Sequence, residues 1–300
     1  MRPRLTKTEI KTGGSKMLVF TLIGLTAAFA IALVYGTIRW QSGTQTLRIA
    51  LDTARRPAQP KTYNAEEIQG LPEPVQRYFR TALKDGQPIV SAVKLEQTGT
   101  MNMSESGEQW SPFSANQRVI TRQPGFDWEA RIAIMHVLPV WVHDAYVARE
   151  GILHASLFGL LPLANLRGTP EAARGELLRF LAEAAWYPTA LLPSQGVQWD
   201  AVSKTSAKAT LIDGPITAVL LFRFNEDGLI ESVRADSRGR MQAGTVMPTP
   251  WEGRWSDYAL HDGMRIPQQG EVAWILPDRA KTYWRGRVTA LHYEFDANRD

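Results

Sequence analysis

The longest hydrophobic run in the chain lies near its N-terminus. Residues 17–38, MLVFTLIGLTAAFAIALVYGTI, contain no charged side chain over 22 positions, and about 20 apolar residues are enough for a helix to cross a bilayer. Residues 1–16 are basic, with only Glu9 opposing five cations: Arg2, Arg4, Lys7, Lys11 and Lys16. The positive-inside rule therefore predicts a cytoplasmic tail over 1–16, a single-pass signal anchor over 17–38 in the inner (cell) membrane, and an exported body.

A cleaved signal peptide is the alternative interpretation of the same run. The sequence AFA at 28–30 has the small-x-small spacing that signal peptidases use. However, the apolar run continues for eight residues beyond it, whereas a signal's apolar region ordinarily ends before the cleavage site. The pattern favours an uncleaved anchor, and a lipoprotein signal is excluded because the chain has no cysteine.

From residue 89 onward, apolar and polar residues alternate. In GFDWEARIAI (125–134) the apolar residues Phe126, Trp128, Ala130, Ile132 and Ile134 share one face, which is the period of a half-buried antiparallel strand. Similar runs occur at 89–101, 113–122, 140–148, 197–211, 215–224, 229–241, 251–260, 265–276 and 281–295. Turn pairs such as Asp213-Gly214, Asp227-Gly228 and Asp262-Gly263 separate several of them. The body is therefore predicted to be mainly antiparallel β.

Helical periodicity is confined to two segments of the body. Residues 72–83 repeat apolar side chains at three- and four-residue steps behind a proline-rich start. The segment from Thr169 to about Pro188 begins with a capping threonine and Pro170, then places leucines along one side. Residues 39–66 are polar and predict a juxtamembrane linker. We predict an exported domain over 67–296 of the α+β class: a curved sheet or half-barrel with a helix crossing its concave face.

Charge and composition narrow the range of partners. Residues 39–300 hold 29 basic and 29 acidic side chains, so the net charge of +4 resides in the N-terminal segment. Nucleic-acid binding by the body therefore lacks electrostatic support, and the membrane is the expected partner. The absence of cysteine excludes disulfides and thiolate chemistry. Serine-hydrolase, phosphate-loop and metalloprotease motifs are absent, so no cofactor and no metal are predicted.

Five strings carry a family resemblance: LPEPVQRYF (71–79), PGFDWEARI (124–132), WYPTALLPSQGVQW (186–199), PTPWEGRWSDY (248–258) and YWRGRV (283–288). With these strings, residues 65–295 resemble an uncharacterised bacterial family of exported or membrane-anchored proteins, a domain of unknown function. The strand order and central helix also resemble, more distantly, the periplasmic lipoprotein-carrier fold, an open half-barrel around an apolar cavity. The family implies no activity, and a fold by itself does not imply one.

Polar residues offer two candidate clusters. His136, His143, Asp144 and Tyr146 lie close in sequence, but on a strand His143 and Asp144 face opposite ways while Asp144 and Tyr146 share a face. Hydrogen-bonded structural residues are the simpler interpretation; a hydrolase or isomerase site is the alternative. In the second cluster, Arg234, Asp236, Arg238 and Arg240 are predicted to share one face of a strand. A solvated outer face is the simpler interpretation, and anion binding is the alternative.

Tryptophan provides the remaining signal. Nine of the ten indoles lie in the body, and only Trp40 lies at the predicted membrane edge, where it would anchor at the interface. Core filling explains many indoles, but apolar ligand cavities are also built from aromatic side chains. We predict binding of a lipid or other hydrophobic ligand, and a non-catalytic scaffold for a protein partner is a further alternative. The candidate ligand-binding residues are Trp186, Leu191, Leu192, Trp199, Trp251, Trp255, Arg238 and Arg240.

Overall fold

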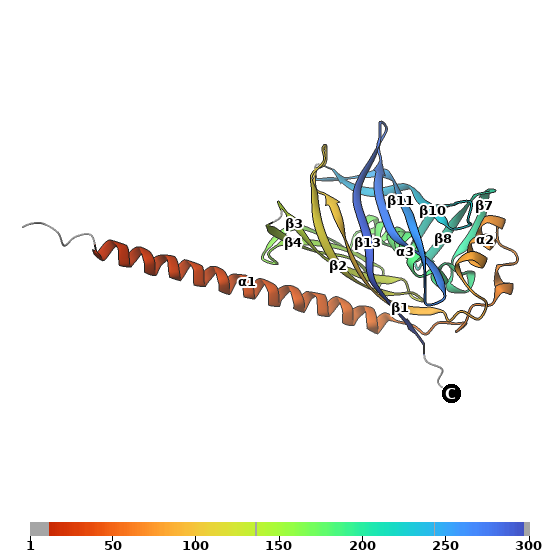
Figure 1. The fold of residues 1–300 in the computed structure, drawn as a ribbon, viewed down its shortest axis with the longest axis horizontal. Coiled ribbons are helices and arrows are strands. Elements are labelled where there is room, and N and C mark those ends of the chain that lie inside the picture. The colour runs from red at the N-terminus through yellow and green to blue at the C-terminus, as the bar shows by residue number, and fades with distance from the viewer. Residues whose placement is uncertain (1–11, 136, 243, 297–300) are drawn as a thin grey trace, which may run out of the picture.

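A computed structural model describes residues 12–135, 137–242 and 244–296. The body is one antiparallel sheet that curves into an open half-barrel (Figure 1). Its strands are β1 (Val90–Asn102), β2 (Trp110–Ile120), β3 (Gly125–Ile134), β4 (Leu138–Val147), β5 (Glu150–Leu157), β6 (Leu161–Arg167), β7 (Gln198–Ser203), β8 (Ser206–Asp213), β9 (Ile216–Phe224), β10 (Ile230–Gln242), β11 (Thr245–His261), β12 (Met264–Ile275) and β13 (Ala280–Phe295).

The sheet consists of two meanders. Strands β1–β6 and β7–β13 each follow chain order, and β1 pairs with β13 to join them, which leaves β6 and β7 at the two edges. Helix α3 (Pro170–Glu183) connects the edges across the concave face and contacts strands of both meanders. The predicted open antiparallel sheet with a central helix is therefore confirmed.

The ends of α3 follow from local sequence. The side chain of Thr169 accepts a hydrogen bond from the backbone N–H of Ala172, and Pro170 occupies the first turn, where its missing N–H costs nothing. After α3, three short 3₁₀ turns (Ala184–Trp186, Pro188–Leu191 and Pro193–Gln195) lead into β7. The remaining helices of the body are η1 (Ala65–Ile68) and α2 (Glu73–Ala82).

Two strands were not predicted from the alternation pattern. Strands β5 and β6 cover 150–167, where we predicted no strand, and the single run predicted over 197–211 is the two strands β7 and β8. β5 does not alternate because it pairs on both sides and α3 covers its concave face. The turn between β7 and β8 lacks glycine; the hydroxyl of Ser203 instead accepts from the N–H of Thr205 and bonds the hydroxyl of Ser206.

Helix α1 (Thr12–Ala54) continues well past the predicted anchor. Its apolar part is long and hydrophobic enough to span a membrane. Residues 39–54, predicted as part of a linker, extend the same helix and pack against the convex face of β2, β3 and β4. Leu51 is completely buried there, in a small cluster with Ile120, Val147 and Ile152.

Trp40 is not the free interfacial anchor that we predicted. Its side chain is only 4% exposed; the indole stacks on His143 with 4.5 Å between ring centroids, and its N–H donates to Glu129 at 3.0 Å. At the C-terminal end of α1, Asp52 pairs with Arg118 of β2 at 2.9 Å, and Arg55, the residue after the helix, pairs with Glu294 of β13 at 2.6 Å. These contacts attach the helix rigidly to the body, because they join α1 and the residue that follows it to strands.

Glycine at position 36 permits this attachment. A Cβ at Gly36 would lie 2.5 Å from the carbonyl oxygen of Phe158, whereas a Cβ at Gly24 would meet nothing within 4 Å. We expect Gly36→Val to destabilise the body by about 1–3 kcal/mol through overpacking, and Gly24→Val to leave it unchanged. Thermal unfolding of the full chain in detergent micelles checks this; equal midpoints for the two variants would contradict the close packing of α1 on the β5–β6 turn.

Candidate functional site

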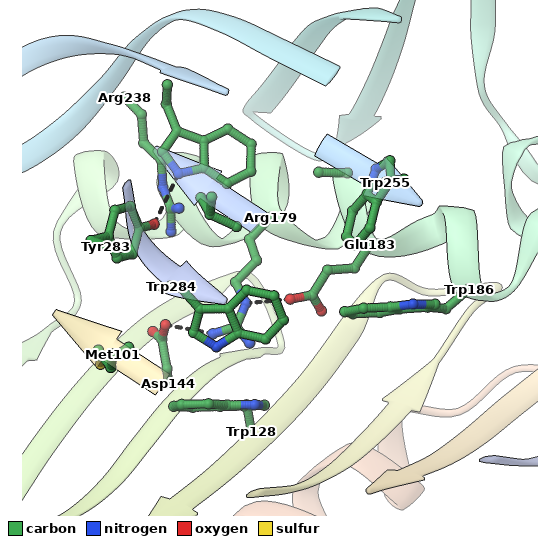
Figure 2. Close-up of a pocket in the computed structure, with 13 residues that line it drawn as sticks. Met101, Trp128, Asp144, Arg179, Glu183, Trp186, Arg238, Trp255, Tyr283 and Trp284 are labelled. Atoms are coloured by element: carbon green, nitrogen blue, oxygen red, sulfur yellow. Dashed lines mark hydrogen bonds and ion pairs between the residues drawn. The ribbon is translucent and has the colours of Figure 1, made fainter. Parts of the chain in front are cut away.

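A cavity lies on the concave side of the sheet, between α3 and strands of both meanders (Figure 2). Its volume is about 70 Å³. Aromatic and aliphatic side chains form most of the wall, with charged side chains from α3, β4 and β10. The lining residues are Met101, Trp128, Asp144, Arg179, Ala182, Glu183, Trp186, Arg238, Trp251, Trp255, Val272, Tyr283 and Trp284.

The indoles of the wall contact one another edge to face. The ring centroid of Trp186 lies 4.8 Å from that of Trp255 and 6.5 Å from that of Trp284. The N–H of Trp251 donates to the hydroxyl of Tyr283 at 2.9 Å. In contrast, the indole nitrogens of Trp186 and Trp255 are buried without any hydrogen-bond partner, although buried indole N–H groups usually have one. Two donors beside the cavity are therefore unsatisfied.

Arg179 lies at the centre of the charged part of the wall. Its guanidinium lies between two carboxylates, 2.6 Å from Asp144 and 2.7 Å from Glu183 (Figure 2). The same group stacks over the ring of Trp128 with 5.0 Å to the centroid. Glu183 also accepts from the amide of Gln117 at 2.6 Å. Burial opposes the charge of Arg179, but the neighbouring carboxylates, Glu183 foremost, outweigh it and raise the pKa of Arg179.

A second arginine–carboxyl pair joins β10 to α3, one turn earlier along the helix. Arg238 donates to Glu176 at 3.0 Å and stacks over Trp251 with 5.0 Å to the ring centroid. Burial, reinforced by the charge of Asp144, raises the pKa of Glu176 to about 8. Glu176 is thus protonated at neutral pH. The two arginines then balance the charges of Asp144 and Glu183, so the wall carries no net charge.

A larger cavity adjoins the first. Its volume is about 520 Å³, and Asp144, Arg238 and Tyr283 line both cavities. Its outer wall consists of residues of the edge strand β6 and of the β10–β11 hairpin, among them Leu163, Ala164, Leu166, Met241 and Val246. We call the first the inner cavity and the second the outer cavity.

The structure brings together half of the residues that we predicted to bind a ligand. Trp186, Trp251, Trp255 and Arg238 line the inner cavity. Leu191, Leu192 and Trp199 do not: both leucines are fully buried, and the indole of Trp199 packs against Phe79 and Phe222 and donates to the carbonyl of Leu191. Arg240 lines neither cavity, but its guanidinium lies 6.0 Å from the ring centroid of Trp274, which lines the outer one.

The predicted arginine face does not exist as one face. A β-bulge between Ala235 and Arg238 shifts the register of β10 against β11. Arg234 therefore lies opposite Glu252, with which it pairs at 3.5 Å, while Arg238 is buried at the inner cavity. Alternation alone could not reveal the bulge, because one extra residue reverses which side chains point inward.

The histidine cluster is likewise divided. His143 lies on the convex face, where Asp127 and Thr44 of α1 bond its two ring nitrogens at 2.8 and 3.1 Å. Asp144 lies on the other face with Arg179, as alternation predicted, and Tyr146 donates to Asp213 at 2.9 Å. His136 lies outside the described residues. Over the described part of the chain, no group of His, Asp and Glu could hold a metal ion.

Sequence reasoning missed the α3 side of the site. Glu176, Arg179 and Glu183 recur at three- and four-residue steps, so they form one helical stripe. Such a stripe is ordinarily solvent-exposed. Here it is buried because the sheet curves around this side of α3, whereas Glu171 and Arg174 on the other side are exposed. The signal in the sequence was a helix, predicted from the Thr169 cap to about Pro188 and placed across the concave face, that carries charged residues at helical spacing.

A solved structure of a LolA superfamily protein from Nitrosomonas europaea aligns with 73% of this chain and 93% of its own, at 8% identity and a TM-score of 0.38. This is the lipoprotein-carrier likeness that we predicted, and at this level it carries no functional inference. No curated protein matches the sequence. Residues 69–293, most of the chain, match the family model DUF6920, described as a family of unknown function. The protein therefore belongs to the DUF6920 family.

Proposed function

We propose that the protein binds a lipid or similar amphiphile across the adjoining inner and outer cavities, with its polar group at the inner one, at the surface of the membrane that α1 spans. The observation that carries this proposal is the pair of buried indole N–H groups, of Trp186 and Trp255, that have no partner beside an aromatic cavity. Leaving a buried donor unpaired costs about 1–3 kcal/mol. A ligand that supplies an acceptor oxygen recovers that free energy.

The charges of the wall favour a neutral acceptor. Arg179 is paired with the carboxylates of Asp144 and Glu183, Arg238 donates to the neutral Glu176, and the two arginines together balance the two carboxylates. An anionic headgroup would have to displace Asp144 or Glu183, whereas an ester or amide carbonyl needs only a free donor. The ligand is therefore an acyl ester or amide, with its chain along the indoles and its carbonyl at Trp186 or Trp255.

Anchoring and orientation complete the proposal. The apolar part of α1 places the body beside a membrane, and the basic residues before it favour a cytoplasmic N-terminus and an exported body. In this arrangement the half-barrel lies at the outer face of the inner membrane. The ligand is then a lipid available from that membrane.

Conservative substitution of the two indoles tests the donor role. We expect Trp186→Phe and Trp255→Phe each to weaken binding of an acyl ester by about 2- to 13-fold, because a hydrogen bond contributes about 0.5–1.5 kcal/mol. Neither should destabilise the ligand-free protein by losing a bond, since each removes an unsatisfied donor. Native mass spectrometry of the full chain, titrated with monoacylglycerol in detergent micelles, measures the binding.

Trp199→Phe is the matched control, because Trp199 is equally buried and lies outside the cavity. It loses a hydrogen bond to Leu191 and should therefore lower stability while leaving affinity unchanged. Equal affinities for wild type, Trp186→Phe and Trp255→Phe would show that neither indole meets a ligand oxygen. Failure of the wild type to retain any acyl ester would overturn the proposed function itself.

A further inference from the structure

Two neighbouring hairpin tips of the body are apolar where tips in water are polar. The β3–β4 turn and the start of β6 expose large hydrophobic side chains; Val137 is 75% and Leu161 61% exposed. We call this set the apolar rim, and it consists of Met135, Val137, Leu138, Leu161 and Leu163. Contiguous exposed apolar side chains of this kind mark interaction surfaces.

Turn chemistry sets the rim apart from other turns of the same sheet. The β8–β9, β9–β10 and β11–β12 turns use Asp-Gly pairs, with the glycine at positive φ. In contrast, Met135 of the β3–β4 turn and Phe158 of the β5–β6 turn adopt φ values of 51° and 55°. That conformation favours glycine, asparagine and aspartate. The steric cost of this conformation does not depend on the solvent, but large apolar side chains at these turn positions, where polar residues are usual, are favoured by a non-aqueous environment.

The two tips are adjacent, and both lie next to α1. Val140 pairs with Leu157 in the sheet, and the N–H of Phe158 donates to the carbonyl of Pro139, which joins the tips. The ring of Phe158 contacts that of Phe29 of α1 at 6.4 Å between centroids. The backbone of the same turn lies against Gly36. The rim therefore lies beside residues 29–36, the C-terminal end of the apolar part of α1, and not beside the more distal part of the helix (Figure 1).

We propose that the apolar rim inserts into the outer leaflet of the bilayer that α1 spans. This inference rests on the membrane anchor of the proposed function, because the contacts with α1 set the depth of the rim relative to the bilayer. The rigid contacts of Trp40, Leu51 and Arg55 hold the body at one angle to the helix, so insertion of the tips does not depend on a flexible tether.

Insertion also gives the outer cavity access to lipid. Leu163 belongs to both the rim and the wall of the outer cavity, which shares Asp144, Arg238 and Tyr283 with the inner one. The edge strand β6 leaves this side of the half-barrel unclosed by strand pairing. An acyl chain thus passes from the leaflet along Leu163 into the outer cavity without crossing water.

Depth-dependent fluorescence quenching tests the insertion. The natural chain has no cysteine, so a single Val137→Cys or Leu161→Cys change in the full chain accepts one environment-sensitive fluorophore. Each labelled protein is placed in lipid nanodiscs, with or without phosphatidylcholine that carries a nitroxide high on its acyl chain. We expect both rim positions to lose most of their emission when the nitroxide lipid is present.

Two control positions separate the possible failures. Ile23→Cys reports on the span itself, since Ile23 is exposed on the apolar part of α1. Ile212→Cys reports on the far end: the neighbouring Asp213 bonds Arg149 and Tyr146, at the opposite end of β4 from the rim, about 30 Å away along a strand of ten residues. Ile212 is also exposed and apolar, and its label should stay unquenched.

The outcomes distinguish the two proposals. Quenching at positions 23, 137 and 161 but not at 212 supports insertion of the rim. Quenching at 23 alone overturns the insertion and leaves the anchor intact. Quenching at 212 as well shows non-specific adsorption of the body and also overturns the insertion. Absence of quenching at 23 removes the anchor, and with it both proposals.

Discussion

Replacing Arg179 by methionine is expected to destabilise the body by about 3–5 kcal/mol, because it leaves the buried Glu183 and the partly buried Asp144 without their cation. Asp144 and Glu183 lie 2.6 and 2.7 Å from the guanidinium. Methionine replaces the aliphatic stem and the contact with Trp128 but none of the positive charge. Urea unfolding of the full chain in detergent micelles, followed by tryptophan fluorescence, measures the loss.

Arg174 provides the matched control, since it lies on the same helix and is exposed. Its guanidinium donates to the carbonyl of Ser237, so Arg174→Met should change stability by at most about 1 kcal/mol. The double variant with Asp144→Asn should recover part of the loss from Arg179→Met, because one of the two stranded charges is removed. Equal effects of the two arginine changes would show that water reaches the carboxylates and that the wall is not a closed ion network.

Replacing Glu176 by glutamine is expected to remove a pH dependence of stability. With a pKa of about 8 in the folded protein and 4.5 as its ordinary value, Glu176 holds a proton in the folded state that the unfolded chain has lost between pH 4.5 and 8. Stability therefore falls as pH rises through that window and levels off above pH 8. Glutamine does not titrate and still accepts from Arg238, so by pH 8 the variant should be more stable than wild type by on the order of 3 kcal/mol.

Unfolding curves recorded from pH 5 to pH 9 measure this difference. Glu171→Gln is the control, because it removes an exposed carboxylate from the first turn of the same helix. Its curve should run parallel to that of wild type. If the Glu176→Gln curve also runs parallel, Glu176 is ionised in the folded protein. The charge cluster of Arg179, Arg238, Asp144, Glu183 and Glu176 would then be net negative, and the preference for a neutral ester or amide would lose its electrostatic basis.

Both experiments bear on the way in which the protein would hold a lipid. A cation is available to an anionic ligand only when its own carboxylates release it, and Arg179 is held by two. The wall is thus built to present apolar indole surface and two indole donors, with its charges satisfied internally. Rigid attachment of α1 and the apolar rim would place that wall beside the leaflet.

Local sequence determined the helices and strands whose sequence patterns do not depend on contacts with distant parts of the chain. The uncharged run at 17–38 predicts a helix wherever it lies, Thr169 and Pro170 define the start of α3 by backbone chemistry, and strict alternation identifies strands such as 125–134. These features depend on neighbours within a few residues. They allowed the antiparallel half-barrel and its central helix to be predicted before any contact was known.

Tertiary structure alone decided which elements cover each face of the strands and helices. The bulge in β10 turned Arg238 inward and Arg234 outward, and the curvature of the sheet buried the charged stripe of α3. Packing of α1 on the convex face buried Trp40 and gave His143 its partners. Periodicity states which side chains share a face, but a face becomes core, cavity or surface only when another element, distant in sequence, covers it or leaves it open.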